Sequence, residues 1–439
     1  MKRTIFDKLF AWKEDQKRKP LIVRGVRQVG KTYILKKFGE RYQRCHYINF
    51  EKDSKLLKIF EKDLDPKRIL DDLSFYLDQS IDIESDLVIF DEIQECPRAL
   101  TSLKYFQEDL SALHICAAGS LLGIHLSPLS FPVGKVDFLT MRPMSFEEFL
   151  MALEDQKSLD ILNNLKLKRE ISELVHEHLW ERLKYYMIIG GMPEAVATYC
   201  DHKDNMFEAF SMVRGKQEDL VLAYYADMTK HSGKVNAMHI DRIFRAIPTQ
   251  LEQVQDRSVA KFKFRGVIPG VSHYHRLVNA IDWLEAAGLV IKVHITNSGK
   301  LPFKAFSKEN AFKLLMFDVG ILGSMSGLSP QSILAYDYGT YKGYFAENFV
   351  AQELMYAYEE ELFSWQERNL ELEFLREIKG EVVPFEVKSG SVVKSKSLKI
   401  FSEKYKSKSR VVLSGKTLSL NKENPTQYYP LYLAGKFPI

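Results

Sequence analysis

The stretch GVRQVGKT, residues 25–32, matches the pattern G-x-x-x-x-G-K-[ST], and it stands between the apolar run LIVR (21–24) and the helical pattern YILKKF. In this pattern the glycines let backbone N–H groups wrap around phosphates, and the start of the following helix adds a favourable dipole. A strand before the motif and a helix after it are the context that the pattern requires. The stretch therefore predicts a phosphate-binding loop, or P-loop, on a parallel α/β sheet.

The residues of this loop have different expected roles. Lys31 is expected to reach the terminal phosphates of ATP and to act in catalysis. The hydroxyl of Thr32 is expected to bind Mg²⁺, which prefers octahedral oxygen ligands. The other expected nucleotide-binding residues are Gly25, Arg27, Gln28, Val29, Gly30 and Tyr33.

A second motif lies about sixty residues further on. The apolar run LVIF (87–90) predicts a buried strand, and it ends in the two carboxylates Asp91 and Glu92, the form of a Walker B segment. Asp91 is expected to hold the Mg²⁺ shell. Glu92 is expected to orient or polarise the attacking water, because hydrolysis needs a proton acceptor near the nucleophile. The alternative for Glu92 is an ordinary surface acid.

Two further parts of such a site are less specific in the sequence. The predicted strand HICAA (114–118) is followed by Gly119 and Ser120, where the serine could sense the γ-phosphate from a neighbouring strand end. A helix N-cap or turn serine explains Ser120 equally well. The candidates for a cation that stabilises the transition state are Arg98, Lys135 and Arg142, although another subunit often supplies this group.

The composition favours a cytoplasmic protein of several domains. A chain of 439 residues exceeds what one hydrophobic core usually serves, and a net charge of +4 requires any nucleic-acid site to be local. The four cysteines are widely spaced without a CxxC pair, which predicts neither a zinc site nor a disulfide framework. The first residues lack the apolar core of a signal peptide, and no apolar run approaches the ~20 residues that span a bilayer. We therefore expect no membrane contact.

The order of the patterns predicts an α/β fold with several parts. Strands are expected at 21–24, 46–50, 87–90, 114–118 and 136–141. Ser145 and Glu148 have capping-box spacing and open a helical region that Gly190-Gly191-Met192-Pro193 interrupts. The expected parts are an amino-terminal helix in 1–20, a P-loop ATPase core in 21–144, a helical lid in 145–230, a winged helix-turn-helix in 231–330 and a small α/β domain in 335–439.

The winged helix-turn-helix rests on one helix near His239, another from Ser272, and the strand LVIKVHI after a glycine stop. A generic helical domain fits the same periodicity. The helix from Ser272 could enter a major groove, yet it has few basic residues for that role. His273 and His275 are better explained as surface residues than as metal ligands, because no third ligand lies nearby in the sequence.

Several motifs together resemble a large prokaryotic family of AAA-type ATPases with a C-terminal region of unknown function. The resemblance covers nearly the whole chain and rests on GVRQVGKT, VIFDEIQE, AAGSLLG, RPMSFEEFL, IIGGMPEAV, LLMFDVGIL and LELEFL with VPFEVKSG. It implies an ATPase core and lid, a winged-helix domain, and a restriction-endonuclease-like fold of the PD-(D/E)XK type. Many relatives have an arginine after glycine where this chain has Gly134 and Lys135, so a catalytic role of Lys135 is in doubt.

The nuclease-like fold implies a second site with Mg²⁺ or Mn²⁺. Its expected ligands are Glu347 on a helix, Glu373 on the strand LELEFL and Glu386 on the strand VVPFEVK, with Lys388 beside them. A turn at Lys379-Gly380 would pair the two strands. The family normally has aspartate at the position of Glu373. The alternative is a solvated charged face of Glu371, Glu373, Glu386 and Lys388 on an inactive fold.

Two functions follow from these patterns. The first is Mg²⁺-dependent ATP hydrolysis that drives conformational change and is coupled to DNA or another nucleic acid. The second is a nucleotide-gated module that binds a protein or DNA without nuclease activity. A basic stretch with Tyr405 could follow a phosphate backbone, but a charged surface helix explains it equally; its cations are Lys394, Lys396, Lys399, Lys404, Lys406, Lys408 and Arg410. A homo-oligomer is also expected, because sites of this type often lie between subunits.

Overall fold

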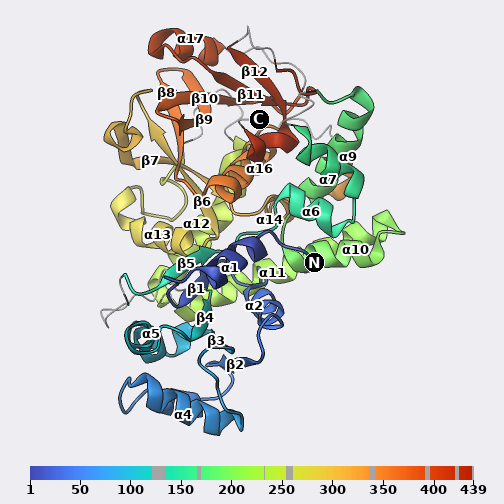
Figure 1. Ribbon diagram of the computed structural model, residues 1–439. Helices are drawn as coiled ribbons and strands as arrows, with labels where there is room; N and C mark the ends of the chain where they lie inside the picture. The colour runs from blue at the N-terminus through green and yellow to red at the C-terminus, as the bar shows by residue number, and fades with distance from the viewer. Residues whose placement is uncertain are drawn as a thin grey trace. The chain divides into compact units, whose positions relative to one another are not determined.

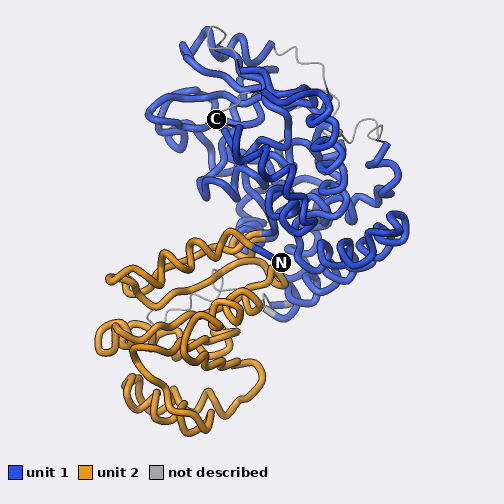
Figure 2. The backbone as a smooth tube through the Cα atoms, turned by 45° about the vertical axis from the view of Figure 1, so that its right-hand side comes forward, with its two compact units in different colours: residues 1–2, 143–285, 289–439 blue, residues 3–142, 286–288 orange. Residues whose placement is uncertain are grey.

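The computed structural model divides the chain into two compact units, and each is considered by itself (Figure 2). The smaller unit comprises Arg3–Arg142 and Ala286–Gly288, and the larger unit comprises Met1–Lys2, Pro143–Glu285 and Leu289–Ile439. The structure describes residues 1–120, 132, 134–165, 170–231, 233–253, 261–335, 342–390, 396–420 and 425–437.

The smaller unit is built on a five-stranded parallel sheet in the order β2-β3-β4-β1-β5 (Figure 1). All five strands coincide with predicted ones: β1 Leu21–Arg24, β2 Cys45–Asn49, β3 Leu87–Asp91, β4 His114–Gly119 and β5 Asp137–Thr140. Its helices are α1 Ile5–Glu14, α2 Lys31–Gly39, α3 Lys55–Ile59, α4 Pro66–Leu77, η1 Ile93–Glu95 and α5 Pro97–Asp109. The prediction of a parallel α/β sheet after the amino-terminal helix is confirmed.

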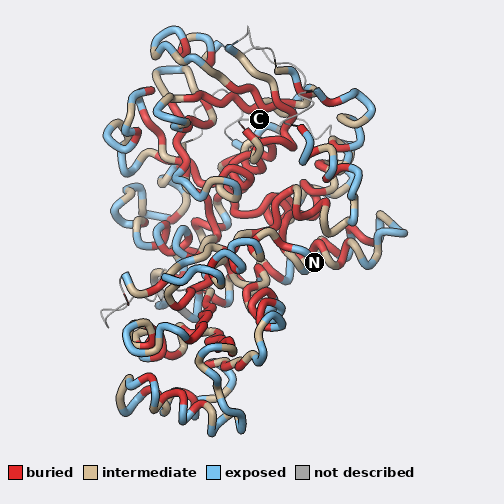
Figure 3. The backbone as a smooth tube through the Cα atoms, in the orientation of Figure 1, coloured by how far each residue is buried: buried red, intermediate tan, exposed pale blue. Residues whose placement is uncertain are grey.

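Burial explains why these strands lie at the centre of the smaller unit. Every residue of β3 and β4 is buried, as their unbroken apolar runs require in a parallel sheet covered on both faces. Ile22, Val88 and Ile115 pack with the rings of Phe60 and Phe106 in one core cluster. Figure 3 shows buried residues in both units, and those of the smaller unit include these central strands. The sheet is therefore a rigid support for the loops at its ends.

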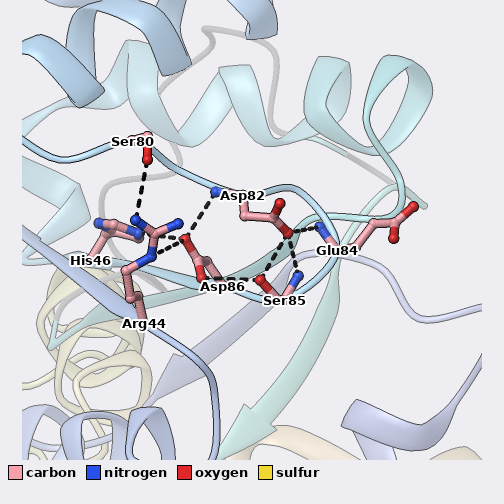
Figure 4. Close-up of polar contacts among 7 residues, drawn as sticks. All are labelled: Arg44, His46, Ser80, Asp82, Glu84, Ser85 and Asp86. Carbon is pink, nitrogen blue, oxygen red and sulfur yellow. Dashed lines mark hydrogen bonds and ion pairs between the residues drawn. The ribbon is translucent and has the colours of Figure 1, made fainter.

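A polar cluster anchors the amino ends of β2 and β3 (Figure 4). The carboxylate of Asp86, whose side chain is fully buried, lies 2.9 Å from Nε2 of His46 and 3.3 Å from Nε of Arg44. It also accepts a 2.9 Å hydrogen bond from the backbone N–H of Asp82. These contacts hold the loop before β3, and so the strand that ends in Asp91, in place.

The larger unit begins with the predicted helical region. Ser145 caps α6, since its hydroxyl accepts a 3.2 Å hydrogen bond from the N–H of Glu148, and the interruption after Ile189 ends where Pro193 starts α10. The helices are α6 Phe146–Ala152, α7 Gln156–Asn163, α9 Glu173–Ile189, α10 Pro193–His202, α11 Met206–His231, α12 Lys234–Gln253, α13 Val278–Ala286, α14 Val319–Met325, α15 Pro330–Leu334, α16 Lys342–Tyr358 and α17 Lys396–Tyr405. Short 3-10 turns are η2 Tyr274–Arg276, η3 Phe303–Phe306 and η5 Leu431–Lys436. Within the described part of the chain, no helix is long and apolar enough to cross a membrane.

A seven-stranded mixed sheet completes the larger unit, in the order β12-β11-β10-β9-β8-β6-β7. Its strands are β6 Val290–Thr296, β7 Ser307–Met316, β8 Leu362–Glu367, β9 Leu370–Ile378, β10 Glu381–Val387, β11 Arg410–Ser414 and β12 Thr426–Pro430. The hairpin of β9 and β10 turns at Lys379 and Gly380, both with positive φ, as predicted. The sequence did not predict β7 or β12.

This sheet crosses the domain boundary expected near residues 330–335. The strand β6 from the predicted part 231–330 pairs in parallel with β8 from the predicted part 335–439, in the register Val293 to Leu362. The strand β6, expected in a winged helix-turn-helix, therefore forms one end of a larger sheet together with β7, because it pairs with β8 on its other side. The predicted helix from Ser272 begins only at Val278. Neither a winged-helix domain nor a restriction-endonuclease-like domain is confirmed.

Candidate nucleotide-binding site

The loop between β1 and α2 has the backbone geometry that its glycines predict. Gly25 has φ of 155°, and a Cβ placed there would lie 2.1 Å from the carbonyl oxygen of Met141. Gly30 has φ of 99° and precedes the first residue of α2. Side chains at these positions would be strained or would clash, so the two glycines shape the turn that points N–H groups and a helix start at one place.

Lys31 folds back into this loop. Its Nζ donates to the carbonyl oxygens of Gly25 at 2.9 Å and Val26 at 3.0 Å. Burial lowers the pKa of Lys31 to about 8, against the opposing effect of the nearby carboxylates of Glu92 and Asp91. The side chain is thus held inside the loop by bonds that an anionic phosphate could replace.

Thr32 and Asp91 meet as the Walker motifs predict. Oδ2 of Asp91 accepts a 2.8 Å hydrogen bond from the hydroxyl of Thr32 and a 2.7 Å bond from the hydroxyl of Tyr47. The hydroxyl and carboxylate are hard oxygen donors, which fit Mg²⁺ with its remaining positions filled by water and phosphate. Thr32 and Asp91 are therefore the residues that would hold the ion.

Two residues on β2 were missed by the sequence reasoning. Tyr47 supports Asp91, and Nδ2 of Asn49 donates to the hydroxyl of Tyr47 at 3.1 Å. Residues two apart on a strand share a face, and Asn49 is the register partner of Asp91. The polar residues at alternate positions of HYINF were the available signal.

Glu92 directly follows β3 in a left-handed conformation, with φ of 49°. Its Oε2 accepts a 2.5 Å hydrogen bond from Nε2 of Gln94. Burial raises the pKa of Glu92, and the charge of Asp91 adds to this, while the bond from Gln94 lowers it. A partly buried carboxylate with a raised pKa and a fixed orientation suits a general base. Gln94 is another residue that the sequence reasoning missed.

The other predicted loop residues differ in exposure. Val29 is buried, Arg27 is half-buried, Gln28 is exposed and Tyr33 is 53% exposed. Ser120 is half-buried just after β4, and β4 lies between β1 and β3 in the sheet. Ser120 is thus at the strand end between the two Walker motifs.

Two of the three candidate cations make side-chain contacts elsewhere in the smaller unit. Arg98 donates to the carbonyl oxygen of Phe60, and Nζ of Lys135 lies 3.0 Å from Glu108. The carbonyl oxygen of Arg142 accepts a 2.6 Å hydrogen bond from Arg3. Just before the candidate cation Lys135, Phe131 and Val133 lie outside the described residues.

Arg3 links the P-loop to the end of β5 and was also missed. Its guanidinium donates to the carbonyl oxygens of Val29 at 3.3 Å and Arg142 at 2.6 Å, and the residue is only 6% exposed. No local pattern relates residues 26 and 139 positions apart. Only folding brings this arginine to the loop.

The larger unit brings the second predicted set of residues together. Lys388 lies 2.5 Å from Glu386, and Oε2 of Glu373 accepts a 3.0 Å hydrogen bond from the N–H of Val387. Burial and the charge of Glu386 raise the pKa of Glu373. Glu347 is bonded instead to Lys313, a buried residue of β7 that the sequence reasoning missed.

The predicted metal site in this set is not supported. Within the described ranges, no three carboxylate, imidazole or thiol side chains converge closely enough to hold an ion. Glu371, a member of the solvated charged face considered as the alternative, lies 2.5 Å from Nζ of Lys313. The physical reason is that lysine ammonium groups lie against the carboxylates that were expected to coordinate the metal.

The basic stretch near the C-terminus is partly neutralised. Lys404 lies 2.5 Å from Glu367, and Lys408 is paired with Glu381. Lys399 lies 3.9 Å from Glu403. Such exposed pairs contribute little to stability but lower the local positive potential. Lys394 lies outside the described residues.

Three family profiles match successive parts of the chain. Residues 17–150 match an AAA domain, residues 180–332 match a domain of unknown function (DUF8612), and residues 342–433 match a domain of unknown function (DUF4143). The first match supports an AAA-type ATPase. No curated protein matches the chain in sequence.

Solved structures similar to the chain include three from microorganisms. The Walker-type ATPase paby2304 of Pyrococcus abyssi is 15% identical, with 73% of this chain and 95% of that chain covered and a TM-score of 0.46. The ORC1 protein of Aeropyrum pernix, in complex with DNA, is 11% identical, with 75% and 93% covered and a TM-score of 0.30. AMPPCP-bound DnaA from Aquifex aeolicus is 14% identical, with 64% and 87% covered and a TM-score of 0.31.

Proposed function

We propose that the chain binds ATP at the P-loop of the smaller unit and hydrolyses it with Mg²⁺. The observation that carries this proposal is the hydrogen bond from Thr32 to Asp91, which joins the two Walker motifs at 2.8 Å. Beside them, Lys31 lies in a loop shaped by two glycines with positive φ. This combination of a cation, a hydroxyl and a carboxylate fits the terminal phosphates and the ion that ATP carries.

In this proposal each residue has a separate part. The N–H groups of the loop and Lys31 bind and orient the phosphates, and Thr32 and Asp91 hold Mg²⁺, which when bound neutralises charge on the phosphate oxygens. Glu92, oriented by Gln94, accepts the proton of the attacking water. Ser120 contacts the γ-phosphate from the end of β4.

The proposal extends to the purpose of the reaction. Hydrolysis drives a conformational change that is coupled to DNA or another nucleic acid through the larger unit. A nucleotide-gated module that binds a protein or DNA without cleaving it is the second candidate, and the ion pairs of Lys404 and Lys313 favour it. Both candidate functions include a homo-oligomer. Arg98 and Lys135 make contacts within the smaller unit, so another subunit would supply the cation that stabilises the transition state.

The test is phosphate release with Mg²⁺ and ATP, with and without DNA. Wild type is compared with Lys31→Ala and Glu92→Gln, and Lys37→Ala is the matched control, because Lys37 lies on the same helix and pairs with Glu40. We expect turnover in wild type and Lys37→Ala and its loss in the other two. Stimulation by DNA would support coupling to nucleic acid; ATP binding without turnover under any condition would leave only the nucleotide-gated module.

A further inference from the structure

A buried lysine lies among the carboxylates of the larger unit. The side chain of Lys313 on β7 is 1% exposed, and its Nζ is 2.7 Å from Oε1 of Glu347 and 2.5 Å from Oε1 of Glu371. These glutamates come from α16 and β9, so one ammonium group joins three elements that are distant in sequence. A lysine ammonium is a compact charge with three donors, and it satisfies oxygens from several directions.

The other carboxylates of this cluster also have protein donors. Oε1 of Glu386 lies 2.5 Å from Nζ of Lys388, and Glu373 accepts the N–H of Val387 at 3.0 Å. Each of the three glutamates expected to bind a metal, Glu347, Glu373 and Glu386, is thus already engaged. Their partners are two ammonium groups and a backbone N–H.

We propose that Lys313 takes the place of a divalent metal ion, so that this carboxylate cluster is a metal-free charge cluster. A divalent ion among the same oxygens would meet the buried ammonium at short range, where unscreened repulsion is strong. Mg²⁺ also needs near-octahedral oxygen ligands. The carboxylate oxygens that would supply them already contact the ammonium groups of Lys313 and Lys388. The larger unit then does not cleave phosphodiesters with a metal ion at this cluster. This inference goes beyond the proposed ATPase and does not depend on it.

Among the described residues, one carboxylate oxygen of the cluster lacks a protein donor. Oε2 of Glu386 is buried and has no hydrogen-bond partner within the described part of the chain, and the side chain is 5% exposed. A single free oxygen is too few for a divalent ion. Replacing Lys313 by a neutral residue would also free the oxygens of Glu347 and Glu371, which lie against the same Nζ atom. The variant would then present carboxylates without their cation.

The experiment is a titration of nucleotide-free protein with Mn²⁺, followed by calorimetry and thermal unfolding. The proteins are wild type, Glu347→Gln, Lys313→Met and the double variant Lys313→Met/Glu347→Gln. Lys292→Met is the matched control, because Lys292 lies on the adjacent strand β6 and pairs with Glu285 at 3.2 Å, outside the cluster. Methionine keeps an unbranched side chain that is one atom shorter, and it removes the charge.

We expect wild type, Glu347→Gln and Lys292→Met to behave alike towards Mn²⁺. Lys313→Met should gain a stoichiometric site and a rise in Tm with Mn²⁺, and the double variant should lose both. Mn²⁺ binding by wild type that Glu347→Gln removes would overturn the proposal, as would a folded Lys313→Met that binds no Mn²⁺. If Lys313→Met does not fold, the comparison of wild type with Glu347→Gln decides. ATP turnover is not a readout, so failure here leaves the ATPase proposal unaffected.

Discussion

The hydroxyl of Thr32 donates a 2.8 Å hydrogen bond to Oδ2 of Asp91, which lies 59 residues further along the chain. This contact joins the start of α2 to the end of β3. Because both residues stand at the carboxyl edge of one parallel sheet, the pairing of β1, β4 and β3 fixes their separation. The same edge carries Lys31 and Glu92.

Removal of the Thr32 hydroxyl should abolish the effect of Mg²⁺. Thr32→Val keeps the shape of the side chain, and we expect turnover to fall on the order of 100-fold, because the ion and the phosphates lose their alignment. Thr32→Ser, which retains the hydroxyl, should stay within a few-fold of wild type. Steady-state phosphate release over a range of Mg²⁺ concentrations measures this. Equal activity of Thr32→Val and wild type would exclude Thr32 as an ion ligand.

Nucleotide affinity should fall at alkaline pH. The pKa of Lys31 is lowered by burial to about 8 in the free protein, and bound phosphates should raise it again. Full affinity is therefore present below pH 8 and is lost as pH rises towards the pKa of the complex, by up to about tenfold per pH unit. Calorimetry in two buffers should detect proton uptake at pH 9. Lys31→Arg, which stays charged, should show no such dependence, and a flat wild-type profile would contradict the prediction.

Gln94 should position Glu92 and tune its pKa. Gln94→Ala removes a hydrogen bond to a charged group, worth about 1.5 kcal/mol, so kcat should fall roughly tenfold with KM for ATP unchanged. Because Gln94 lowers the pKa of Glu92, the acidic limb of the pH–rate profile should move to higher pH in the variant. Gln79→Ala, an exposed site after α4, is the control. An unmoved acidic limb would show that Gln94 has only a structural role.

The stability of the larger unit should fall at alkaline pH because of Glu353. Its Oε1 accepts the N–H of Phe146 at 2.9 Å, and burial raises its pKa to about 8. When the pKa of an acid is higher in the folded state than in the unfolded state, the acid stabilises the folded state fully below its unfolded-state pKa. This stabilisation is lost as pH rises through the folded-state pKa. Between pH 5 and pH 9 the loss should reach at most roughly 4 kcal/mol.

Glu353→Gln keeps an acceptor for Phe146 and should remove this part of the pH dependence. Urea unfolding at several pH values, monitored by tryptophan fluorescence, measures the free energy of unfolding of wild type and variant. Glu377→Gln, at an exposed position of β9, should follow the wild-type curve. Parallel curves for wild type and Glu353→Gln would show that Glu353 does not titrate in this range.

Asp86 should stabilise the smaller unit from the other end of the sheet. Burial by itself raises the pKa of its carboxyl, but the N–H of Asp82, His46 and the charge of Arg44 lower it overall. The carboxylate of Asp86 therefore stabilises the folded state above its unfolded-state pKa. This stabilisation is lost as pH falls through the folded-state pKa. Asp86→Asn should lower the free energy of unfolding by about 2–4 kcal/mol at pH 7. The exposed Glu84→Gln should change it little, and an equal effect of both would contradict the role of Asp86.

Local patterns were sufficient for the smaller unit. The five strands, the P-loop and the carboxylates at the end of β3 follow from short apolar runs and glycine spacing, because a parallel sheet places its strand ends at one edge. Support from Tyr47, Gln94 and Arg3 was not predicted. The alternation in HYINF was a local signal for Tyr47, whereas the contacts of Arg3 with residues 26 and 139 positions away have no local signal in the sequence.

By itself, the sequence determined that this protein has a P-loop sheet with Lys31, Thr32, Asp91 and Glu92 at its edge, since motif spacing and hydrophobic periodicity act within short segments. Only the tertiary structure decided that β6 pairs with β8 across an expected domain boundary. It also decided that Lys313 lies between Glu347 and Glu371. The physical reason is that strand pairing and buried ion pairs join residues that are distant in the sequence. Which lysine contacts which carboxylate therefore depends on how the whole unit folds.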